Sequence, residues 1–572
     1  MISIVCLATF IFAPQDVPLA RGAYRGPYDE VLREQAAAAE SEDSESKVLL
    51  DAWDRWEFWF EFQREILFRG LMERPGAAVQ NDRYGPEDWA LGRQEALEVG
   101  QPVLLRALDS KFPVIREAAA LALGRMGSNA AVNPLKRALG DSSSQVRQAA
   151  LLGLGLIGDE DSVLALAGVF RNPSHTAGMR AFAALGLGLS GRPEAGDLVD
   201  SYLKRNLKPD RVYGEEETVL SGAVWAAGIL PAPGLTVTLL RGAEELRTGA
   251  ASGSRKLRTV LFQALGNRQD RLARPYLIES LNSQDLAQRR SAALALGSLG
   301  DPAAIPALQR AFLAGGDLET RMFALLSAGQ IGGHQAVAWL NQVGPETVKH
   351  RQLRSAWSLA VGMAQVGPEL ETLRIELTGH EPNQAGAKVR RDEERLRGAV
   401  AVGLGLFGDR RTLADIQESM AVKGLDPDFA GYLAIGAGAL GGSQATQYLL
   451  KLSRQEGKQV DFTRGLVLGL GLVKDPRAAA EITRCLLEET HPEVQWAASR
   501  ALGLVRSRKA FQTLITALSE EGEVRREPEN LAAMIRALGF LTDVRRGESV
   551  GSFLRNMNYR QDFRMLRVLR AY

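Results

Sequence analysis

QVRQAALLGLGLIGD, residues 145–159, is the stretch that decides the fold. It places Arg147 near its start, continues with small and aliphatic residues, and carries Gly155 eight positions after the arginine. Copies of this template recur about every thirty residues, and internal repetition with such a period predicts a stacked helical solenoid. Its clearest other copies are VIREAAALALGRMG (114–127), GMRAFAALGLGLSG (178–191), QRRSAALALGSLGD (288–301), RLRGAVAVGLGLFGD (395–409) and VQWAASRALGLV (494–505).

Each repeat has the pattern of two helices. A leucine-rich first helix is followed by a polar turn and by the arginine-led second helix, which ends at glycine, often with proline close behind, as at 300–302. We therefore predict an all-α fold, a right-handed α-solenoid of about thirteen helix pairs. The glycines that mark the pairs, called anchor glycines below, are Gly124, Gly155, Gly188, Gly228, Gly266, Gly297, Gly329, Gly362, Gly405, Gly438, Gly471, Gly503 and Gly539.

Four steps between anchor glycines are longer than the rest, and their extra residues are polar or charged. They lie near 204–216, 244–256, 379–394 and 520–529. Insertions in a solenoid often form loops on its binding side. The mixed-sign runs KVRRDEERLR (388–397) and EEGEVRREPE (520–529) are therefore predicted to be solvated loops.

The two ends of the chain depart from the repeat. We divide the chain into a possible signal peptide (1–20), a flexible linker (21–47), an N-terminal helical cap (48–100), the solenoid (101–546) and a basic tail (547–572). The apolar run 2–13 has the length of a signal-peptide core and is too short to span a membrane, so we predict export to the periplasm or cell envelope. No Lys or Arg precedes it, however, and a mis-assigned start would leave the protein in the cytoplasm. The arginine-rich tail is a candidate for docking to an acidic partner.

The segment WDRWEFWFEF (53–62) is rich in aromatic residues. Trp53, Trp56, Trp59 and Phe60 recur at helical spacing. The first unit of a solenoid exposes an apolar face, so one interpretation is a helix that caps it. The alternative is an aromatic platform for a ligand such as a sugar or a peptide.

The arginines that open the second helices would stack into a row along the solenoid. Either they pair with acids in the preceding turns, as Asp109 could with Arg116 and Asp141 with Arg147, or they form a cationic stripe for anionic ligands. We favour the structural interpretation. The row consists of Arg116, Arg147, Arg180, Arg258, Arg289, Arg321, Arg354 and Arg397.

Charge and motifs give little support to catalysis or to nucleic-acid binding. The 69 basic side chains balance 68 acidic ones, which removes the general electrostatic argument for a nucleic-acid partner. The two cysteines and five scattered histidines lack metal-ligand spacing. GxGxxG matches such as 153–158 close a helix instead of opening one, as a dinucleotide loop requires. We therefore expect no cofactor, no metal site, no transmembrane helix and no enzymatic activity.

Units such as VRQAALLGLGLIGD (146–159) and RRSAALALGSLGDPAAIPAL (289–308) resemble HEAT repeats, in particular the short kind called PBS-lyase HEAT-like repeats. The resemblance covers roughly residues 101–546 and implies an α–α superhelix of the ARM/HEAT type. Proteins of this kind include scaffolds, assembly factors and a minority of enzymes, among them lyases that attach bilin. The aromatic segment 53–62 also resembles the start of exported, uncharacterised bacterial HEAT-repeat proteins.

The first functional hypothesis is a non-catalytic scaffold that binds a protein or extended peptide along the concave face of a curved solenoid. Its oligomeric state is not readable from the sequence. The alternative is an enzyme or enzyme subunit on the same frame, bilin-lyase-like or other, for which no catalytic residue is identified. That alternative would be favoured if tryptophans stood free along the groove; the four to check are Trp225, Trp339, Trp357 and Trp496.

Overall fold

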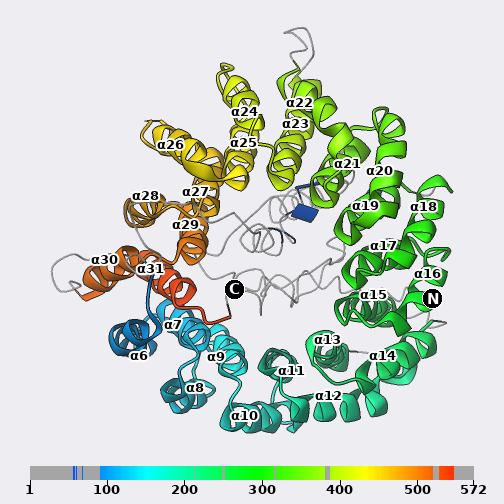
Figure 1. The fold of residues 1–572 in the computed structure, drawn as a ribbon. Helices are drawn as coiled ribbons and strands as arrows, with labels where there is room; N and C mark the ends of the chain where they lie inside the picture. Colours follow the sequence, from blue (N-terminus) through cyan, green and yellow to red (C-terminus); the bar gives the residue numbers. More distant parts are fainter. Residues whose placement is uncertain are drawn as a thin grey trace, which may run out of the picture.

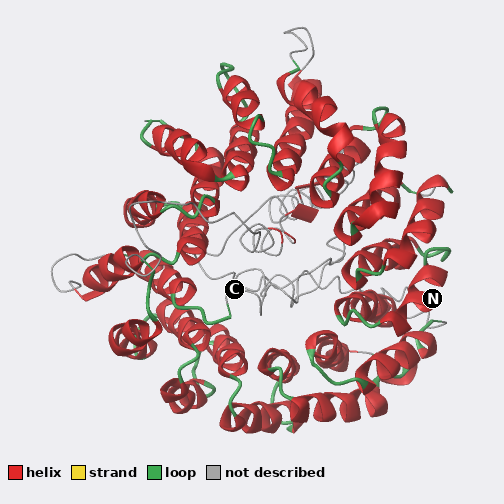
Figure 2. Ribbon diagram, viewed as in Figure 1, coloured by secondary structure: helices red, strands yellow, loops and turns green. Residues whose placement is uncertain are grey.

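The computed structural model describes residues 90–212, 214–247, 252–314, 317–379, 387–455, 457–519 and 527–545, together with residues 56, 57, 59, 60, 63 and 67. The predicted signal peptide, the linker, Trp53 and the basic tail lie outside these residues. The described residues are mainly helical, and none of them forms a β-strand longer than one isolated bridge (Figure 2). None of their helices combines the length and the apolar character needed to cross a membrane.

The described residues form thirteen helix pairs, as the repeat predicts. The second helix of each pair carries the anchor glycine and lies on the inner side (Figure 1). The inner helices are α7 (Pro113–Met126), α9 (Ser144–Ile157), α11 (Ala177–Ser190), α13 (Gly214–Ile229), α15 (Ser252–Asn267), α17 (Leu286–Leu299), α19 (Leu318–Ile331), α21 (Arg351–Ala364), α23 (Ala387–Phe407), α25 (Pro427–Leu440), α27 (Val460–Leu472), α29 (Pro492–Val505) and α31 (Pro528–Leu541). The outer helices are α6 (Gln101–Leu108), α8 (Val132–Ala138), α10 (Glu160–Arg171), α12 (Pro193–Asn206), α14 (Gly234–Glu245), α16 (Arg274–Ser280), α18 (Ile305–Leu313), α20 (Gly333–Thr347), α22 (Leu370–Thr378), α24 (Thr412–Met420), α26 (Gly442–Ser453), α28 (Pro476–Glu488) and α30 (Arg508–Ser519).

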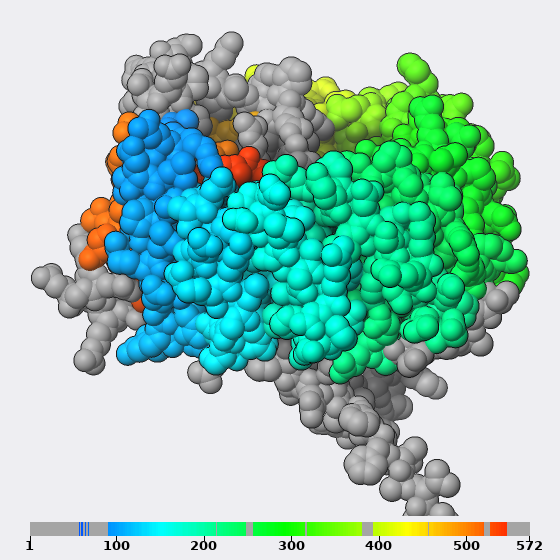
Figure 3. Space-filling model, turned by 90° about the horizontal axis from the view of Figure 1, so that it is seen from below, coloured from blue at the N-terminus to red at the C-terminus, as the bar shows by residue number. Residues whose placement is uncertain are grey.

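The solenoid closes into a ring. Each inner helix packs on the next one along the chain, and the last of them, α31, packs on the first, α7 (Figure 1). Figure 3 shows the outside of the ring, where the last units (orange) border the first (blue). An open curved solenoid with a long concave groove was expected. Closure replaces that groove with an inner wall that surrounds the centre of the molecule.

Small residues allow the inner helices to approach one another closely. A Cβ atom added to Gly155 would lie 2.6 Å from the Cα of Gly186, and one added to Gly438 would lie 2.5 Å from the Cα of Gly469. Most anchor glycines face glycine, alanine or serine on the next inner helix. Glycine inside a helix costs about 1 kcal/mol relative to alanine, so these glycines are retained for the close backbone approach that they permit.

Several inner helices end at the glycine stop signal read from the sequence, whereas α21 and α29 end with Gln365 and Arg506 in the same left-handed region. Gly300 adopts a left-handed conformation (φ 69°) directly after α17, and Asp301 then accepts a hydrogen bond from the N–H of Ala303 to begin the next turn. Only glycine occupies this backbone region without strain, which explains why the same residue type recurs at the ends of α7, α9 and α11.

The junction between α31 and α7, called the seam below, repeats the contact made at the other junctions. A Cβ added to Gly539 would lie 2.8 Å from the Cα of Ala122. A buried ion pair joins Arg125 of α7 to Asp543, with 3.0 Å between the guanidinium nitrogen and the carboxylate oxygen. The N–H of Val544 donates to the carbonyl of Arg125 at 3.0 Å. Since α31 covers α7, the face of the first unit that the aromatic segment was expected to cap is occupied by the last unit.

The run 388–397, predicted to be a solvated loop, is helical. It forms the start of α23, which begins at Ala387 and continues to Phe407. Lys, Arg and Glu have high helix propensity, and the run has neither glycine nor proline to end a helix. Glu393 pairs with Arg351 of the preceding inner helix at 3.4 Å, so the charged start of α23 also contributes a contact between units.

Candidate binding site on the inner wall

The described aromatic residues of the N-terminal segment lie inside the ring. Trp56, Trp59 and Phe60 are at most 2% exposed. The ring of Trp56 lies 4.7 Å from the ring of Tyr432 on α25, and that of Phe60 lies 6.0 Å from the same tyrosine, edge to face. Such tilted aromatic pairs add about 0.5–1.5 kcal/mol each to the burial of their surfaces. The segment therefore packs on α23 and α25, far along the ring from the first unit.

Polar groups fix the orientation of Trp56. Its indole N–H donates to the backbone carbonyl of Arg395 on α23 at 3.0 Å. The guanidinium of the same arginine lies 3.7 Å from the carboxylate of Glu57, the next residue of the segment. A buried indole N–H usually finds an acceptor, because leaving it unpaired costs free energy. This pair of contacts defines which face of the segment meets α23.

Gly398 leaves the space that the indole occupies. A Cβ added there would lie 3.3 Å from the ring of Tyr432 and 3.5 Å from the ring of Trp56. These neighbours are aromatic side chains, whereas most anchor glycines face backbone atoms. We call Gly398, Tyr432 and the carbonyl of Arg395 the aromatic socket.

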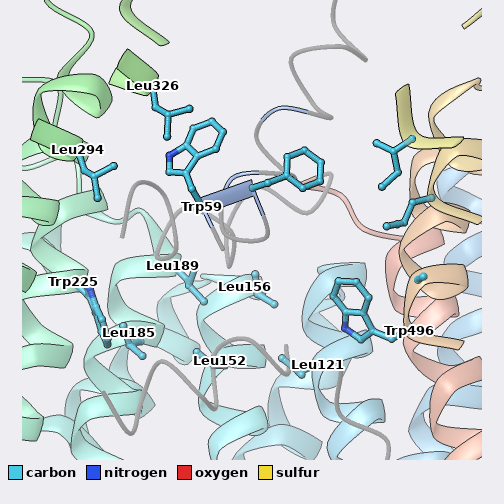
Figure 4. Packing of buried hydrophobic residues seen from close by; sticks show 14 of the residues in the cluster. Trp59, Leu121, Leu152, Leu156, Leu185, Leu189, Trp225, Leu294, Leu326 and Trp496 are labelled. Carbon is cyan, nitrogen blue, oxygen red and sulfur yellow. The ribbon is translucent and has the colours of Figure 1, made fainter. Parts of the chain in front are cut away.

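Two hydrogen-bond donors among the described residues of the segment are buried without an acceptor. The indole nitrogen of Trp59 and the amide nitrogen of Gln63 have no partner in the described part of the chain, although each residue is 1% exposed. Figure 4 shows Trp59 in the space that the inner helices surround. A buried donor without an acceptor costs roughly 1–3 kcal/mol. The segment therefore fits the inner wall well at Trp56 and less well at Trp59 and Gln63.

Apolar side chains line much of the rest of the inner wall. Several inner helices carry a leucine three positions before the anchor glycine on the side that Figure 4 views, and these leucines are buried, at most 6% exposed. On α13 and α15 the same position holds Trp225 and Gln263, which are joined by a hydrogen bond of 2.9 Å from the indole N–H to the amide oxygen. The leucines that Figure 4 shows at this position are Leu121, Leu152, Leu185, Leu294 and Leu326.

A charged cluster lies beside the socket. Asp428 is one turn before Tyr432 on α25, so the two residues share a face of that helix. Arg464 on α27 is 8% exposed and contacts Asp428 at 2.8 Å, Glu493 at 3.2 Å and Asp461 at 3.7 Å. Partial desolvation raises the pKa of Asp428 to about 6, although 41% of its side chain remains exposed. Arg464 opposes this shift, while Asp461, Asp426 and Glu57 add to it.

Replacing Asp428 by asparagine is expected to raise the thermal midpoint modestly at pH 7.5, since 41% of the Asp428 side chain is exposed, and to leave it nearly unchanged at pH 3. The folded chain holds the Asp428 proton more tightly than the unfolded chain, because the pKa is raised above the ordinary value of 3.8. The cost of ionising Asp428 in the folded state therefore grows as the pH rises from 3.8 to about 6 and stays constant above that, and asparagine removes it. Thermal unfolding measured from pH 3 to pH 8 tests the expectation.

Asp141→Asn is the matched control with the opposite sign. The hydrogen bond from Arg116 lowers the pKa of Asp141. Its contribution to stability is therefore present at neutral pH and is lost as the pH falls through the lowered pKa. A pH profile for Asp428→Asn that runs parallel to that of the wild type would contradict the assignment.

The row of arginines lies at the turns between outer and inner helices. Seven of the eight donate to a backbone carbonyl near the C-terminal end of their own outer helix or in the turn that follows it, and Arg321 stacks on Phe312 at the corresponding place. A guanidinium suits this place, where carbonyls lack intrahelical partners and the helix dipole is negative. The carbonyl acceptors belong to Ser110, Asp141, Phe170, Leu246, Ser283, Gly344 and Leu377.

The acids that meet these arginines come from the following unit. Arg116 pairs with Asp141 at 2.7 Å, and Arg354 pairs with Glu376 at 2.7 Å. The expected pairs Asp109–Arg116 and Asp141–Arg147 are therefore corrected, since Arg147 binds the backbone carbonyl of Asp141 and leaves the carboxylate to Arg116. For Arg116 and Arg354, the preceding outer helix or turn provides the carbonyl acceptor and the next unit provides the carboxylate. The arginines thus link neighbouring units.

The remaining candidates for chemistry are buried. Trp225, Trp339, Trp357 and Trp496 are at most 6% exposed, which leaves the enzyme alternative without the feature that would have favoured it. Burial raises the pKa of Cys485 to about 11, so its thiol is protonated at neutral pH. Among the described residues, no group of three or more His, Cys, Asp or Glu side chains is arranged to hold a metal ion.

Comparison with known proteins gives the type of repeat. The model of HEAT repeats matches residues 89–151, 243–318 and 459–532. No curated protein matches the sequence. One similar solved structure is that of the complex of CpcE and CpcF of phycocyanin lyase from Nostoc sp. PCC7120. The sequence identity is 22% and the TM-score is 0.30, and the match covers 47% of this chain and 96% of that chain. Human deoxyhypusine hydroxylase in complex with glycerol is 22% identical, with a TM-score of 0.22, over 48% of this chain and 99% of that chain.

Proposed function

We propose that this chain, which contains HEAT repeats and closes into a ring, is a non-catalytic interaction scaffold whose inner wall binds a segment of a protein partner. The observation that carries this proposal is the aromatic socket, where the wall already holds the helical residue Trp56 through a tilted aromatic contact and a hydrogen bond. Thirteen junctions between inner helices run around the whole ring, and the contacts of the socket are additional to them.

The inner wall has the properties of a protein-binding surface. It combines apolar side chains with a few fixed polar groups, the mixture found at the centre of protein interfaces. Aromatic anchors in desolvated pockets contribute most of the affinity at such interfaces, and Tyr432 offers one side of such a pocket. The charged cluster around Arg464 provides a polar rim next to it.

Filling the socket is expected to reduce partner recovery about tenfold. In Gly398→Leu the added side chain points at the rings of Tyr432 and Trp56, while leucine is a better helix former than glycine and preserves α23. Wild-type and variant proteins are immobilised, incubated with native cell extract and compared by quantitative mass spectrometry. A single protein recovered in stoichiometric amount on the wild type and lost on Gly398→Leu is the expected result.

Gly168→Leu is the control, because Gly168 on α10 has no atom within 4 Å of an added Cβ. It changes an outer helix by the same substitution and leaves the socket intact. Equal recovery on both variants would place the partner elsewhere on the ring. Recovery of small molecules alone would argue against a scaffold.

A further inference from the structure

The described residues of the N-terminal segment lie in the socket as a ligand would. Residues 56, 57, 59, 60, 63 and 67 are all helical. Trp56, Phe60, Gln63 and Leu67 recur at intervals of four, three and four residues and so share one face. That face meets the inner wall, where Trp56 and Phe60 contact Tyr432. Helix-in-groove recognition uses the same spacing of anchors.

The fit of this helix is imperfect. Its two unpaired buried donors, on Trp59 and Gln63, remove part of the free energy gained at Trp56. A helix that offered acceptors to these donors would bind the same wall more tightly.

We infer that the aromatic socket recognises an amphipathic helix with Trp and Phe four residues apart and an acid after the Trp, and that Trp56, Glu57 and Phe60 occupy it as a tethered competitor. This inference rests on the proposed function, since it names the chemistry of the partner. The acid is specified by Arg395, whose guanidinium lies 3.7 Å from Glu57. The Trp is specified by the carbonyl of Arg395 and by the space above Gly398.

A synthetic peptide of residues 48–72, labelled with fluorescein, is the probe. Its binding is measured by fluorescence anisotropy on full-length wild type and on the full-length double variant Trp56→Ala/Phe60→Ala. An occupied site lowers the apparent affinity by the fraction of molecules in which it is free. We expect the double variant to bind the peptide at least tenfold more tightly than the wild type. Adding Gly398→Leu to the double variant is expected to abolish binding, and a peptide with alanine at both aromatic positions is expected not to bind.

A second measurement avoids any substitution in the segment. A protease site is inserted between residues 72 and 90, and the purified protein is cleaved. A tethered competitor is expected to exchange with an excess of labelled peptide once the covalent link is cut. Failure of the peptide to bind the double variant and to exchange into the cleaved ring would overturn the inference and identify the segment as a permanent part of the core.

The outcomes separate the two proposals. Loss of partner capture on Gly398→Leu without any peptide binding would support the inner wall as the binding surface and reject the tethered competitor. Peptide binding without partner capture would support the socket chemistry and reject the scaffold function. If sedimentation shows a wild-type dimer that Trp56→Ala/Phe60→Ala dissociates, the segment is exchanged between two copies of the chain, and the competitor is rejected.

Discussion

Asp543→Ala is expected to lower the free energy of unfolding by about 3–5 kcal/mol and to open the ring at the seam. The side chains of Arg125 and Asp543 are 4% and 2% exposed, and their charged atoms are 3.0 Å apart. Removing the carboxylate leaves the guanidinium buried without this counter-charge, and a buried charge is costly when its partner is removed. The guanidinium also stacks 4.2 Å from the ring of Phe540, so its displacement would disturb the packing of α31.

Hydrogen exchange followed by mass spectrometry locates the effect. Amides of α7 and α31 are expected to exchange faster in Asp543→Ala, because the seam is the one junction where no short connection along the chain holds the neighbouring units together. Amides of α17 and α19, on the far side of the ring, are expected to keep their wild-type rates (Figure 1). Small-angle scattering should report a larger radius of gyration if the ring opens fully.

Glu488→Ala serves as the surface control. Glu488 pairs with Arg484 at 2.6 Å, but the two side chains are 61% and 43% exposed, and exposed ion pairs contribute at most about 1 kcal/mol. The double substitution Arg125→Met/Asp543→Leu removes both charges together and is expected to recover most of the lost stability. Equal losses for Asp543→Ala and Glu488→Ala would show that the seam does not depend on this pair.

Gly438→Leu is expected to lower the free energy of unfolding by about 3 kcal/mol. The added Cβ would lie 2.3 Å from the carbonyl oxygen of Gly469 and 2.5 Å from its Cα. Both are backbone atoms, so relief requires α25 and α27 to move apart, and overpacking of this kind outweighs the gain of about 1 kcal/mol in helix propensity. Thermal and urea unfolding followed by circular dichroism provide the measurement.

The same substitution at Gly168 is expected to raise stability by up to about 1 kcal/mol, since leucine favours the helix and an added Cβ meets no atom there within 4 Å. The two variants therefore differ in sign although the chemical change is identical. If Gly438→Leu were as stable as the wild type, close backbone approach would not explain the anchor glycines.

The repeat predicted the helix pairs because the signals involved are local. Helix propensity, the glycine stop and the apolar spacing act within one unit, so each copy of the template reports the same structure. Arg116 and Arg147 show where such local reasoning fails. Their separation from Asp109 and Asp141 suggested pairs within one turn, but the orientation of the guanidinium depends on the next unit, which supplies Asp141 to Arg116.

Closure of the ring was not predicted, because it depends on a small rotation between neighbouring units summed over thirteen of them. A slight change in that rotation would leave an open spiral with the same sequence pattern. The seam residues could have been suspected from the sequence, since Arg125 interrupts a position that is apolar in α9 and α11. The contact of Arg125 with Asp543 could be recognised only in the folded ring, because the two residues are 418 positions apart in the chain.

Local sequence patterns were enough to predict the helix pairs, since each pair is set by residues within about one repeat of one another. The contact between the first and last units, and that of Trp56 with α23, 339 residues away, became visible only in the folded ring. Contacts at such separation depend on the curvature of the whole ring and on which inner helices leave space beside Gly398. No local pattern in the chain encodes either quantity.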